Sequence, residues 1–434
     1  MKPPSSPIND KMGDVPSFLL DALRFQDTNK QGLRKATDAE WTRVLSHWHT
    51  VRLTLPLRRA GGDEMPLWVR ERIDTFLSDN AARFERIKEA YSRAGEALDK
   101  AGVDHLVIKG FSLWPGYTEH PKYRPQSDID LYCRPETVVR AREALLALGY
   151  TTKPAWGRLS TEHLSPLIAP AAWAWRGNYF DPEIPASFEL HFAWWDGVTT
   201  CLHPQGLHDF WERRVRTKIG DVCFTALDPV DNVGYTAINL LRNLLGGCAA
   251  VEQMYSLARF LHTFAEERHF WQRWRILHPA SLRRLEAISF LAASEWFACR
   301  LSEEAREEVY RLSPAIHRFF RHFSKAALST EYLRTKDGLW LHLAILESKS
   351  EKAAVFFQRV FPVHASTIPS LPADDPTKGA KSKTYPRPER VTRKSATFVK
   401  WFITRGLHHL LILGTTLRRG LAFRLASKDQ GRES

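Results

Sequence analysis

Apolar side chains follow the helical period over the first hundred residues. The stripe that predicts a helix over residues 38–57 consists of Trp41, Val44, Leu45 and Trp48. A second helix is predicted over residues 66–100, where the stripe consists of Ile73, Phe76, Leu77, Phe84, Ile87, Tyr91 and Leu98. Gly102 follows that stripe, and a glycine at this position is typical of a helix end.

The pattern changes after Gly102. Residues 105–108 form a short apolar run that stops at Lys109-Gly110, which is typical of a buried strand that enters a tight turn. Residues 111–117 are expected to be helical. Residues 118–127 are polar and predict a loop.

Polar and apolar residues alternate over residues 128–133 and again over residues 187–192, as they do in half-buried strands. Between these segments, residues 135–148 predict an amphipathic helix that Gly149 closes. Strands and helices thus alternate over about 90 residues, which indicates an α/β or α+β module.

Long helical stripes replace this pattern from about residue 228. Their members are Ile238, Leu241, Leu244 and Leu245; Met254, Leu257, Ala258 and Leu261; and Ile288, Leu291 and Trp296. They predict an all-α region. The predicted division of the chain is a flexible segment over 1–34, an α/β domain with N-terminal helices over 35–227, a helical domain over 228–362, a Pro/Lys-rich linker over 363–396 and a basic amphipathic helix over 397–434.

Composition excludes several classes of protein. The chain has 434 residues, more than one ordinary core, since domains hold roughly 100–200 residues. Its 44% hydrophobic and 26% charged residues are typical of packed cores rather than of disorder. No apolar run reaches the roughly 18 residues of a membrane span. The first 15 residues lack the apolar segment of a secretory signal, which predicts a cytoplasmic protein.

The net charge of +13 is concentrated at the end of the chain. Residues 378–434 contain 14 Lys or Arg and 3 Asp or Glu, a net of +11, which leaves +2 for the first 377 residues. Specific binding of nucleic acid by the folded body is therefore not predicted. The five cysteines are widely spaced and form no CxxC pair, so neither a zinc site nor a disulfide framework is predicted.

The sharpest chemical signal is Asp128-Ile129-Asp130. Two carboxylates separated by one residue of a strand point to the same face of a sheet, where their charges repel and raise each other's pKa. A divalent cation such as Mg²⁺ removes this cost, because it takes oxygen ligands and commonly uses carboxylates together with substrate phosphates. Glu189, in the later alternating segment, is a third acid that can join the same site from a neighbouring strand.

The segment over about residues 103–192 resembles the uncharacterised bacterial nucleotidyltransferases, a branch of the superfamily with the polymerase-β-type fold. The residues that carry the resemblance are Lys109-Gly110, Tyr117, Arg124-Pro125, Asp128-Ile129-Asp130-Leu131, Leu148-Gly149-Tyr150 and Glu189-Leu190-His191. The resemblance implies an α+β fold with a small mixed-sheet nucleotidyltransferase domain flanked by helices, followed by an all-α domain and the basic amphipathic tail.

The resemblance also implies the chemistry. An acceptor hydroxyl would attack the α-phosphate of a nucleoside triphosphate, and pyrophosphate would leave. Asp128, Asp130 and Glu189 are the implied catalytic residues and the implied ligands of Mg²⁺ or Mn²⁺. The residues implied to bind the nucleotide are Lys109, Gly110, Ser112, Arg124 and His191, with His191 expected beside the site and hydrogen-bonded to Glu189. The acceptor can be a small molecule, a sugar or a protein hydroxyl.

The basic tail gives a second hypothesis. Its apolar positions, among them Leu407, Leu410, Leu411 and Leu417, alternate with Lys and Arg. Such a helix can lie on an anionic membrane surface through residues 397–426, which would place the protein at the inner face of the membrane. The alternative is a helix that docks on the protein body.

Two further interpretations remain open. One is a catalytically degenerate nucleotidyltransferase-fold scaffold that binds a partner. The other is nucleic-acid binding through the basic tail, which predicts a steep dependence on salt.

Overall fold

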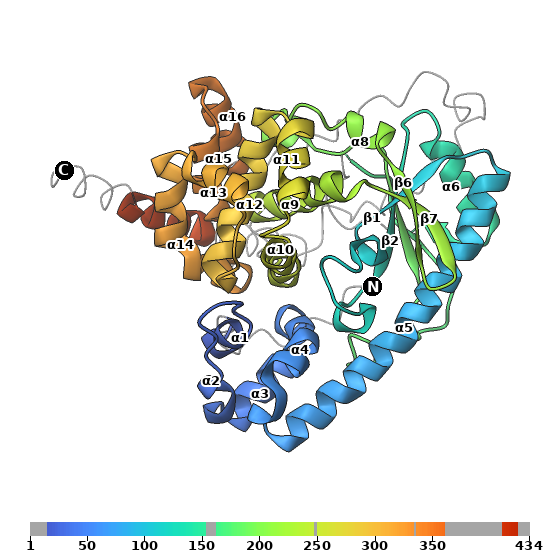
Figure 1. Ribbon diagram of the computed structural model, residues 1–434, viewed down its shortest axis with the longest axis horizontal. Coiled ribbons are helices and arrows are strands. Elements are labelled where there is room, and N and C mark those ends of the chain that lie inside the picture. Colours follow the sequence, from blue (N-terminus) through green and yellow to red (C-terminus); the bar gives the residue numbers. More distant parts are fainter. Residues whose placement is uncertain (1–14, 153–161, 247–249, 334–335, 361–409, 424–434) are drawn as a thin grey trace, which may run out of the picture.

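The computed structural model describes residues 15–152, 162–246, 250–333, 336–360 and 410–423 (Figure 1). The strands are β1 (His105–Ile108), β2 (Asp128–Cys133), β3 (Thr151–Thr152), β4 (Leu167–Ile168), β5 (Ser187–His191), β6 (Val215–Ile219) and β7 (Val222–Ala226). The helices before the last strand are α1 (Ser17–Ala22), α2 (Gln31–Lys35), α3 (Asp38–Ser46), α4 (Trp48–Gly61), α5 (Leu67–Lys100), α6 (Val138–Ala147), α7 (Gly197–Thr200) and α8 (Asp209–Glu212), with the 3₁₀ helices η1 (Gly62–Glu64), η2 (Gly110–Leu113) and η3 (Pro121–Tyr123). The helices after it are α9 (Pro229–Gly246), α10 (Val251–Thr263), α11 (Arg268–Leu277), α12 (Ala280–Phe297), α13 (Glu303–Tyr310), α14 (Pro314–Leu333), α15 (Gly338–Ile345) and α16 (Lys349–Val360).

In the described part of the chain, the strands form one seven-stranded mixed sheet in the order β3-β4-β5-β2-β1-β7-β6. The central strand β2 pairs antiparallel with β1 and parallel with β5. Its register places Asp130 opposite Glu189 and Tyr132 opposite His191. Two segments that are far apart in the sequence are therefore neighbours in the sheet.

Alternation along β2 and β5 decides which side chains face which core. One face is apolar and packs against α5 and α6; its residues on these two strands are Ile129, Leu131, Cys133, Phe188 and Leu190. The opposite face carries the polar members of the alternation and looks toward the helices that follow the sheet. Figure 1 shows α5 and α6 on one side of the sheet and α9 to α12 on the other.

The helices after the sheet share one hydrophobic core with the N-terminal helices. The buried members of the predicted stripes are Ile238, Leu241, Leu244, Leu245, Met254, Leu257, Ala258, Leu261, Ile288, Leu291 and Trp296. Helix α12 packs along both α9 and α10. None of the helices in the described ranges combines the length and the apolarity that a membrane crossing requires.

Three predicted elements differ in the structure. Residues 38–57 form two helices rather than one, because His47 is extended (φ −106°, ψ 129°) and its imidazole caps the Arg43 carbonyl at 2.7 Å. Residues 111–117, expected to be helical, contain only the end of the short helix η2 and a turn. The helix predicted from residue 135 begins at Val138.

Four strands carried no clear signal in the sequence. β3 and β4 have two residues each, too few for a period to be visible. β6 and β7 form a hairpin whose turn contains Gly220 at φ 60°, a conformation that favours glycine. The sheet is therefore wider than the alternating segments indicated.

The sequence predicts a flexible segment over 1–34, whereas its described part contains α1 and the start of α2, joined by an irregular connection. Leu19 of α1 and Leu33 of α2 are fully buried in the larger core, which explains why residues 15–34 are ordered onto the body. Residues 1–14 and the predicted linker over 363–396 lie outside the described residues. Of the predicted tail over 397–434, residues 410–423 are described, and they are helical.

A buried ionic cluster holds α9, α11 and α12 together. His278 Nε2 lies 3.1 Å from Asp231 Oδ1, and His278 Nδ1 lies 2.8 Å from Glu286 Oε1. Arg213 forms two hydrogen bonds with the Asp231 carboxylate, at 2.8 and 2.7 Å. Burial by itself would lower the pKa of His278, but the charges of Glu286 and Asp231 raise it to about 9. The cluster therefore contains a protonated histidine at neutral pH.

Replacing His278 by glutamine is expected to lower the free energy of unfolding by about 3 kcal/mol, because it leaves two carboxylates buried with less compensation. Since the folded pKa of His278 lies above its unfolded value of about 6.5, the stabilisation is complete below that pH and disappears as the pH rises through about 9. Urea denaturation at a series of pH values measures both effects. His208→Gln, at an exposed imidazole beside Asp209, is the control, and an equal loss in both variants would contradict the prediction.

Candidate active site

Strands β2 and β5 bring four polar side chains onto one face of the sheet. Asp128 and Asp130 alternate along β2, Glu189 and His191 alternate along β5, and the register pairs Asp130 with Glu189. Asp130 and His191 are buried, with 5% and 1% of their area exposed, whereas 24% of the Glu189 side chain is exposed. All three acids predicted from the sequence are thus on the same face.

Asp130 is the centre of this group. Its Oδ1 lies 2.9 Å from His191 Nε2, which in turn lies 3.7 Å from Glu189 Oε2. One ligand atom from each of these three residues lies within 4.8 Å of the others, so Asp130, Glu189 and His191 form a group that can hold a metal ion. This group contains His191, which the sequence placed beside the metal, and does not contain Asp128.

Lys109 inserts a positive charge into the acidic group. Its Nζ donates a hydrogen bond to Asp130 Oδ1 at 2.8 Å. Burial alone would lower the pKa of Lys109, but the Asp130 charge raises it above its usual value. Burial likewise would raise the pKa of Asp130, and the charge of Lys109 with the hydrogen bond from His191 holds it below its usual range. Both groups are therefore charged.

The backbone of Lys109 is strained in order to place this charge. It has φ 60° and ψ −160°, a region that residues other than glycine rarely adopt. Such a conformation costs about 1–3 kcal/mol and is typical of functional sites. The ion pair with Asp130 offsets this cost.

Asp128 has the opposite electrostatic character. Burial and the charges of Asp130 and Glu189 together raise its pKa to about 6, although the charges of Lys109 and Arg52 lower it. The carboxylate is accordingly destabilised in its ionised form. It is the acid of this face that has most to gain from an added cation.

The turn after β1 is built around Gly110 and Ser112. A side chain at Gly110, which has φ 52°, would meet the amide of Gln126 at 2.2 Å, and that amide donates to the Asp128 carbonyl at 2.8 Å. The Ser112 hydroxyl donates to the Lys109 carbonyl at 2.6 Å. Gly110 and Ser112, both predicted to bind the nucleotide, therefore shape the turn that carries Lys109. The group that lies close to Gly110 is the Gln126 side chain.

Helix α5 fixes the loop that precedes β2. The Arg83 guanidinium donates to the carbonyl oxygens of Gln126 at 2.7 Å and Ser127 at 3.1 Å, and Asn80 donates to that of Lys122 at 2.9 Å. Burial lowers the pKa of Arg83 to about 10. Neither Asn80 nor Arg83 was predicted from the sequence. The pattern that could have indicated them is two polar residues, three positions apart, within the apolar stripe of α5.

Arg124 lies in a different cluster from the acids. Its Nε lies 3.2 Å from Glu252 Oε1 of α10, and Arg52 Nη2 of α4 lies 2.9 Å from Glu252 Oε2. Arg52 still acts on the acidic group, because its charge lowers the pKa of Asp128. The two clusters are therefore neighbours.

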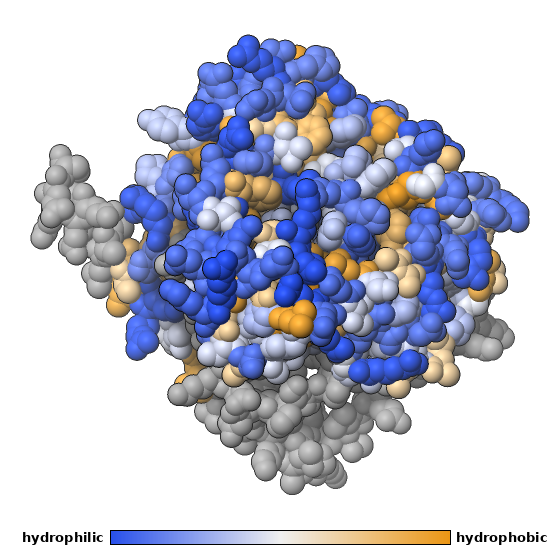
Figure 2. All heavy atoms as spheres, turned by 60° about the horizontal axis from the view of Figure 1, so that its bottom comes forward, coloured by the Kyte–Doolittle hydropathy of each residue, from blue (hydrophilic) through white to orange (hydrophobic). Residues whose placement is uncertain are grey.

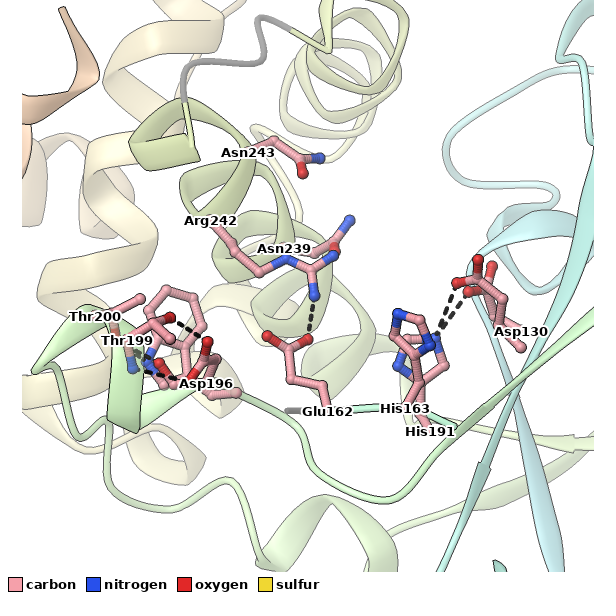
Figure 3. A network of polar contacts seen from close by, with 12 residues as sticks. Asp130, Glu162, His163, His191, Asp196, Thr199, Thr200, Asn239, Arg242 and Asn243 are labelled. Carbon is pink, nitrogen blue, oxygen red and sulfur yellow. Dashed lines mark hydrogen bonds and ion pairs between the residues drawn. The ribbon is translucent and has the colours of Figure 1, made fainter. Parts of the chain in front are cut away.

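Helix α9 presents polar side chains to the acidic face. Figure 3 shows Arg242 directed toward Glu162 with Asn239 beside it, and His163 beside His191 next to Asp130. Arg242 is paired with Glu162 and donates to Asn239 Oδ1 at 2.9 Å. The rings of His163 and His191 are 5.1 Å apart. Because His163 Nδ1 contacts the Leu164 carbonyl at 2.7 Å, its Nε2 carries the lone pair when the ring is neutral.

These residues, which face the sheet from the side of α9, were not predicted from the sequence. The signal in α9 was the polar set Asn239, Arg242 and Asn243, three and four positions apart in the mainly apolar second half of the helix. His163 carried no signal of its own, because it reaches the site through an isolated bridge to His191 in the sheet.

Comparison with known proteins finds one protein family. The model of a family described as uncharacterised nucleotidyltransferase matches residues 37–298, which are 262 of the 434 residues. The match contains the acidic face, the turn after β1 and the polar side of α9. No curated protein and no solved structure matches the chain.

Asp128→Asn is expected to raise the free energy of unfolding at about pH 7.5 by about 1–2 kcal/mol, because it removes an ionised group whose pKa is raised by burial. Since the folded pKa of about 6 lies above the unfolded value, ionisation destabilises the fold increasingly as the pH rises through that range. The advantage of the variant should therefore shrink by more than half at about pH 4.5.

Urea denaturation of both proteins at the two pH values measures this effect. Asp104→Asn, at a carboxylate with 84% of its side chain exposed, is the control and should change little. A destabilised Asp128→Asn variant at neutral pH would show that the Asp128 charge stabilises the fold, contrary to the prediction.

Proposed function

This chain belongs to the uncharacterised nucleotidyltransferase family, and from this we propose that it moves a nucleoside monophosphate from a nucleoside triphosphate to a hydroxyl acceptor. The single observation that carries the proposal is the pairing of Asp130 with Glu189 across β2 and β5, with Asp128 on the same face. Three carboxylates on one partly buried face require compensation by positive charge.

The residues fit a divalent cation. Asp130 and Glu189 offer oxygen ligands, His191 offers a nitrogen in the same group, and Asp128 adds a carboxylate nearby. Carboxylate oxygens suit Mg²⁺ and Mn²⁺, and the imidazole favours the transition metal Mn²⁺. When bound there, such a cation would neutralise charge that develops on the phosphoryl oxygens.

Lys109 supports the binding of phosphate. Its ammonium is the buried positive charge nearest to Asp130, at 2.8 Å, and it lies at the tight turn after β1. An ammonium in this position suits the oxygens of a triphosphate. Arg124 and Ser112 complete the proposed nucleotide set, Arg124 as a second cation on the loop before β2 and Ser112 by holding the turn.

The polar residues that face the sheet from the side of α9 support the binding of an acceptor hydroxyl. In the proposed reaction the acceptor oxygen forms a bond to the α-phosphorus, the bond to the pyrophosphate oxygen breaks, and the hydroxyl proton passes to a base. His163 is the base that we favour, because burial lowers its pKa and keeps it neutral. Glu189 is less suitable: burial would raise its pKa, but the interaction with His191 and the charge of Lys109 leave it below the usual value. Asn239 and Arg242 offer polar groups to the acceptor.

Asp130→Asn is expected to weaken metal-dependent binding of nucleoside triphosphate by at least about tenfold and pyrophosphate release by about 100-fold or more. The physical reason is the loss of the central charge of the group. Thermal stabilisation by each common nucleoside triphosphate with Mn²⁺ or Mg²⁺ measures binding without knowledge of the acceptor. Glu189→Gln, at a more exposed acid, repeats the test with less risk to folding.

Glu183→Gln, at an exposed carboxylate paired with Arg86, is the matched control. Unchanged nucleotide affinity in both Asp130→Asn and Glu189→Gln would refute the assignment. Nucleotide binding without pyrophosphate release, with every nucleotide and a wide range of acceptors, would instead support the degenerate scaffold.

We also propose that the C-terminal helix attaches the protein to an anionic membrane surface. Within residues 410–423, Thr416 is fully buried, Arg419 pairs with Asp337 at 3.0 Å and Gly420 packs against Trp340, so this side of the helix docks on the body. The other side exposes Leu410, Leu411, Leu417 and Leu421 by 62%, 70%, 40% and 59%.

An anionic lipid surface is the partner that fits this leucine face. Residues 378–434 carry 14 Lys or Arg against 3 acids, and each basic residue near such a surface contributes about 1 kcal/mol. Figure 2 shows a face of the molecule on which hydrophilic residues predominate and hydrophobic ones form scattered patches.

The full-length protein should sediment with vesicles that contain phosphatidylglycerol and not with vesicles of phosphatidylcholine alone. Replacing the four leucines by serine should reduce the sedimented fraction to the phosphatidylcholine level, because the apolar contribution is lost. Leu67→Ser with Leu148→Ser, at two other exposed leucines, is the control. If the leucine variant sediments with these vesicles as much as the wild type does, the proposal is wrong. If the wild type is a dimer and the leucine variant is a monomer, the leucine face binds a second copy of the chain instead.

A further inference from the structure

A group of arginines meets between α4, the loop around η3, and α10. Its members are Arg52, Arg59, Arg124 and Arg259, and the ion pairs described for them are with two carboxylates, Glu119 and Glu252. The group therefore carries a net charge of +2. It comes from three separate parts of the chain, so only the folded structure assembles it.

Three of the four arginines are largely withdrawn from water, whereas the Arg59 side chain is 57% exposed. The exposed fractions of the side chains are 19% for Arg52, 11% for Arg124 and 21% for Arg259, and that of Glu252 is 5%. Excess charge of one sign at such depth is unfavourable unless a counter-charge is bound. A dianion would balance the group.

A small cavity opens among these side chains. Its volume is about 40 Å³, and Arg59, Arg124, Arg259, Tyr117 and Tyr255 are among its lining residues. Since a water needs roughly 10–15 Å³ measured in this way, the cavity has room for a few water-sized groups, such as the oxygens of one phosphate. Arg259 Nη1 is bound to Glu119 Oε1 at 2.7 Å, while its buried Nε has no hydrogen-bond partner in the described part of the chain.

The loop that carries Arg124 also leads into the acidic face. The Asn80 amide donates a hydrogen bond to the Arg124 carbonyl at 3.3 Å. Arg124 lies four residues before Asp128 in the sequence. Arg52 acts electrostatically on Asp128. A ligand in the cavity would therefore lie next to the proposed reaction site.

We propose that this arginine cavity binds a phosphate dianion carried by a substrate. The inference rests on the proposed function only in its choice of substrate: the phosphate is either that of a phosphorylated acceptor or the terminal phosphate of the nucleotide. Guanidinium groups suit it because their planar fork matches phosphate oxygens. Tyr117 and Tyr255 provide the apolar walls.

Inorganic phosphate is the probe for this cavity. Titrated into the full-length protein without nucleotide or divalent metal, it should raise the melting temperature, whereas chloride at equal ionic strength should not. Arg259→Gln should weaken the apparent affinity about tenfold or more. Glu119→Gln should strengthen it, because removing the competing carboxylate takes the net charge from +2 to +3; this opposite change cannot result from misfolding.

Arg300→Gln, at an arginine that is 53% exposed and paired with Glu266, is the control and should bind phosphate as the wild type does. No response of the wild type to phosphate, or equal responses of Arg259→Gln and the wild type, would overturn the proposal. Asp130→Asn should retain phosphate binding, which separates a failure of this inference from a failure of the nucleotidyl-transfer proposal.

The source of the phosphate follows from competition with nucleoside triphosphate in the presence of Mn²⁺. If phosphate and nucleotide bind together and Arg259→Gln leaves nucleotide affinity unchanged, the cavity serves the acceptor. If phosphate displaces the triphosphate and Arg259→Gln weakens the triphosphate more than the diphosphate, it holds the terminal phosphate. Either result supports a phosphate site.

Discussion

The ion pair between Lys109 and Asp130 is the interaction on which the polar face of the sheet depends. Three carboxylates and one imidazole of β2 and β5 lie on this face, and Asp130 is 5% exposed, so its charge is tolerated only with a partner. Lys109 provides that partner at 2.8 Å through a strained backbone. Asp128 has less compensating positive charge than Asp130, and its pKa is accordingly raised to about 6.

The surroundings of this ion pair are built to keep it in place. Arg83 and Asn80 of α5 bind the carbonyl groups of the loop before β2, so that a helix far away in the sequence sets where β2 begins. On the opposite side, α9 brings Arg242 and Asn239 toward the strands. Such support from neighbouring elements is what holds charged side chains at fixed separations.

Buried charge is a recurring feature of the helical half as well. The cluster around His278 balances its charges within the fold, since one protonated imidazole and Arg213 face two carboxylates. The arginine group around Glu252 does not balance, because four cations share two acids. Balanced buried clusters stabilise or organise a fold, whereas an unbalanced one is the more natural place for a charged ligand.

Patterns in the sequence were enough to predict the strands β1, β2 and β5, the long helix α5, the buried stripes of α9, α10 and α12, and the family. They were enough because alternation and helical periodicity are local properties, and because the Lys-Gly, Asp-x-Asp and Glu-x-His segments are short. Only the tertiary structure decided that Glu189 lies opposite Asp130, that Lys109 neutralises it, and that Arg124 joins Glu252 instead. These contacts depend on strand register and on packing between distant segments, and no local pattern encodes either.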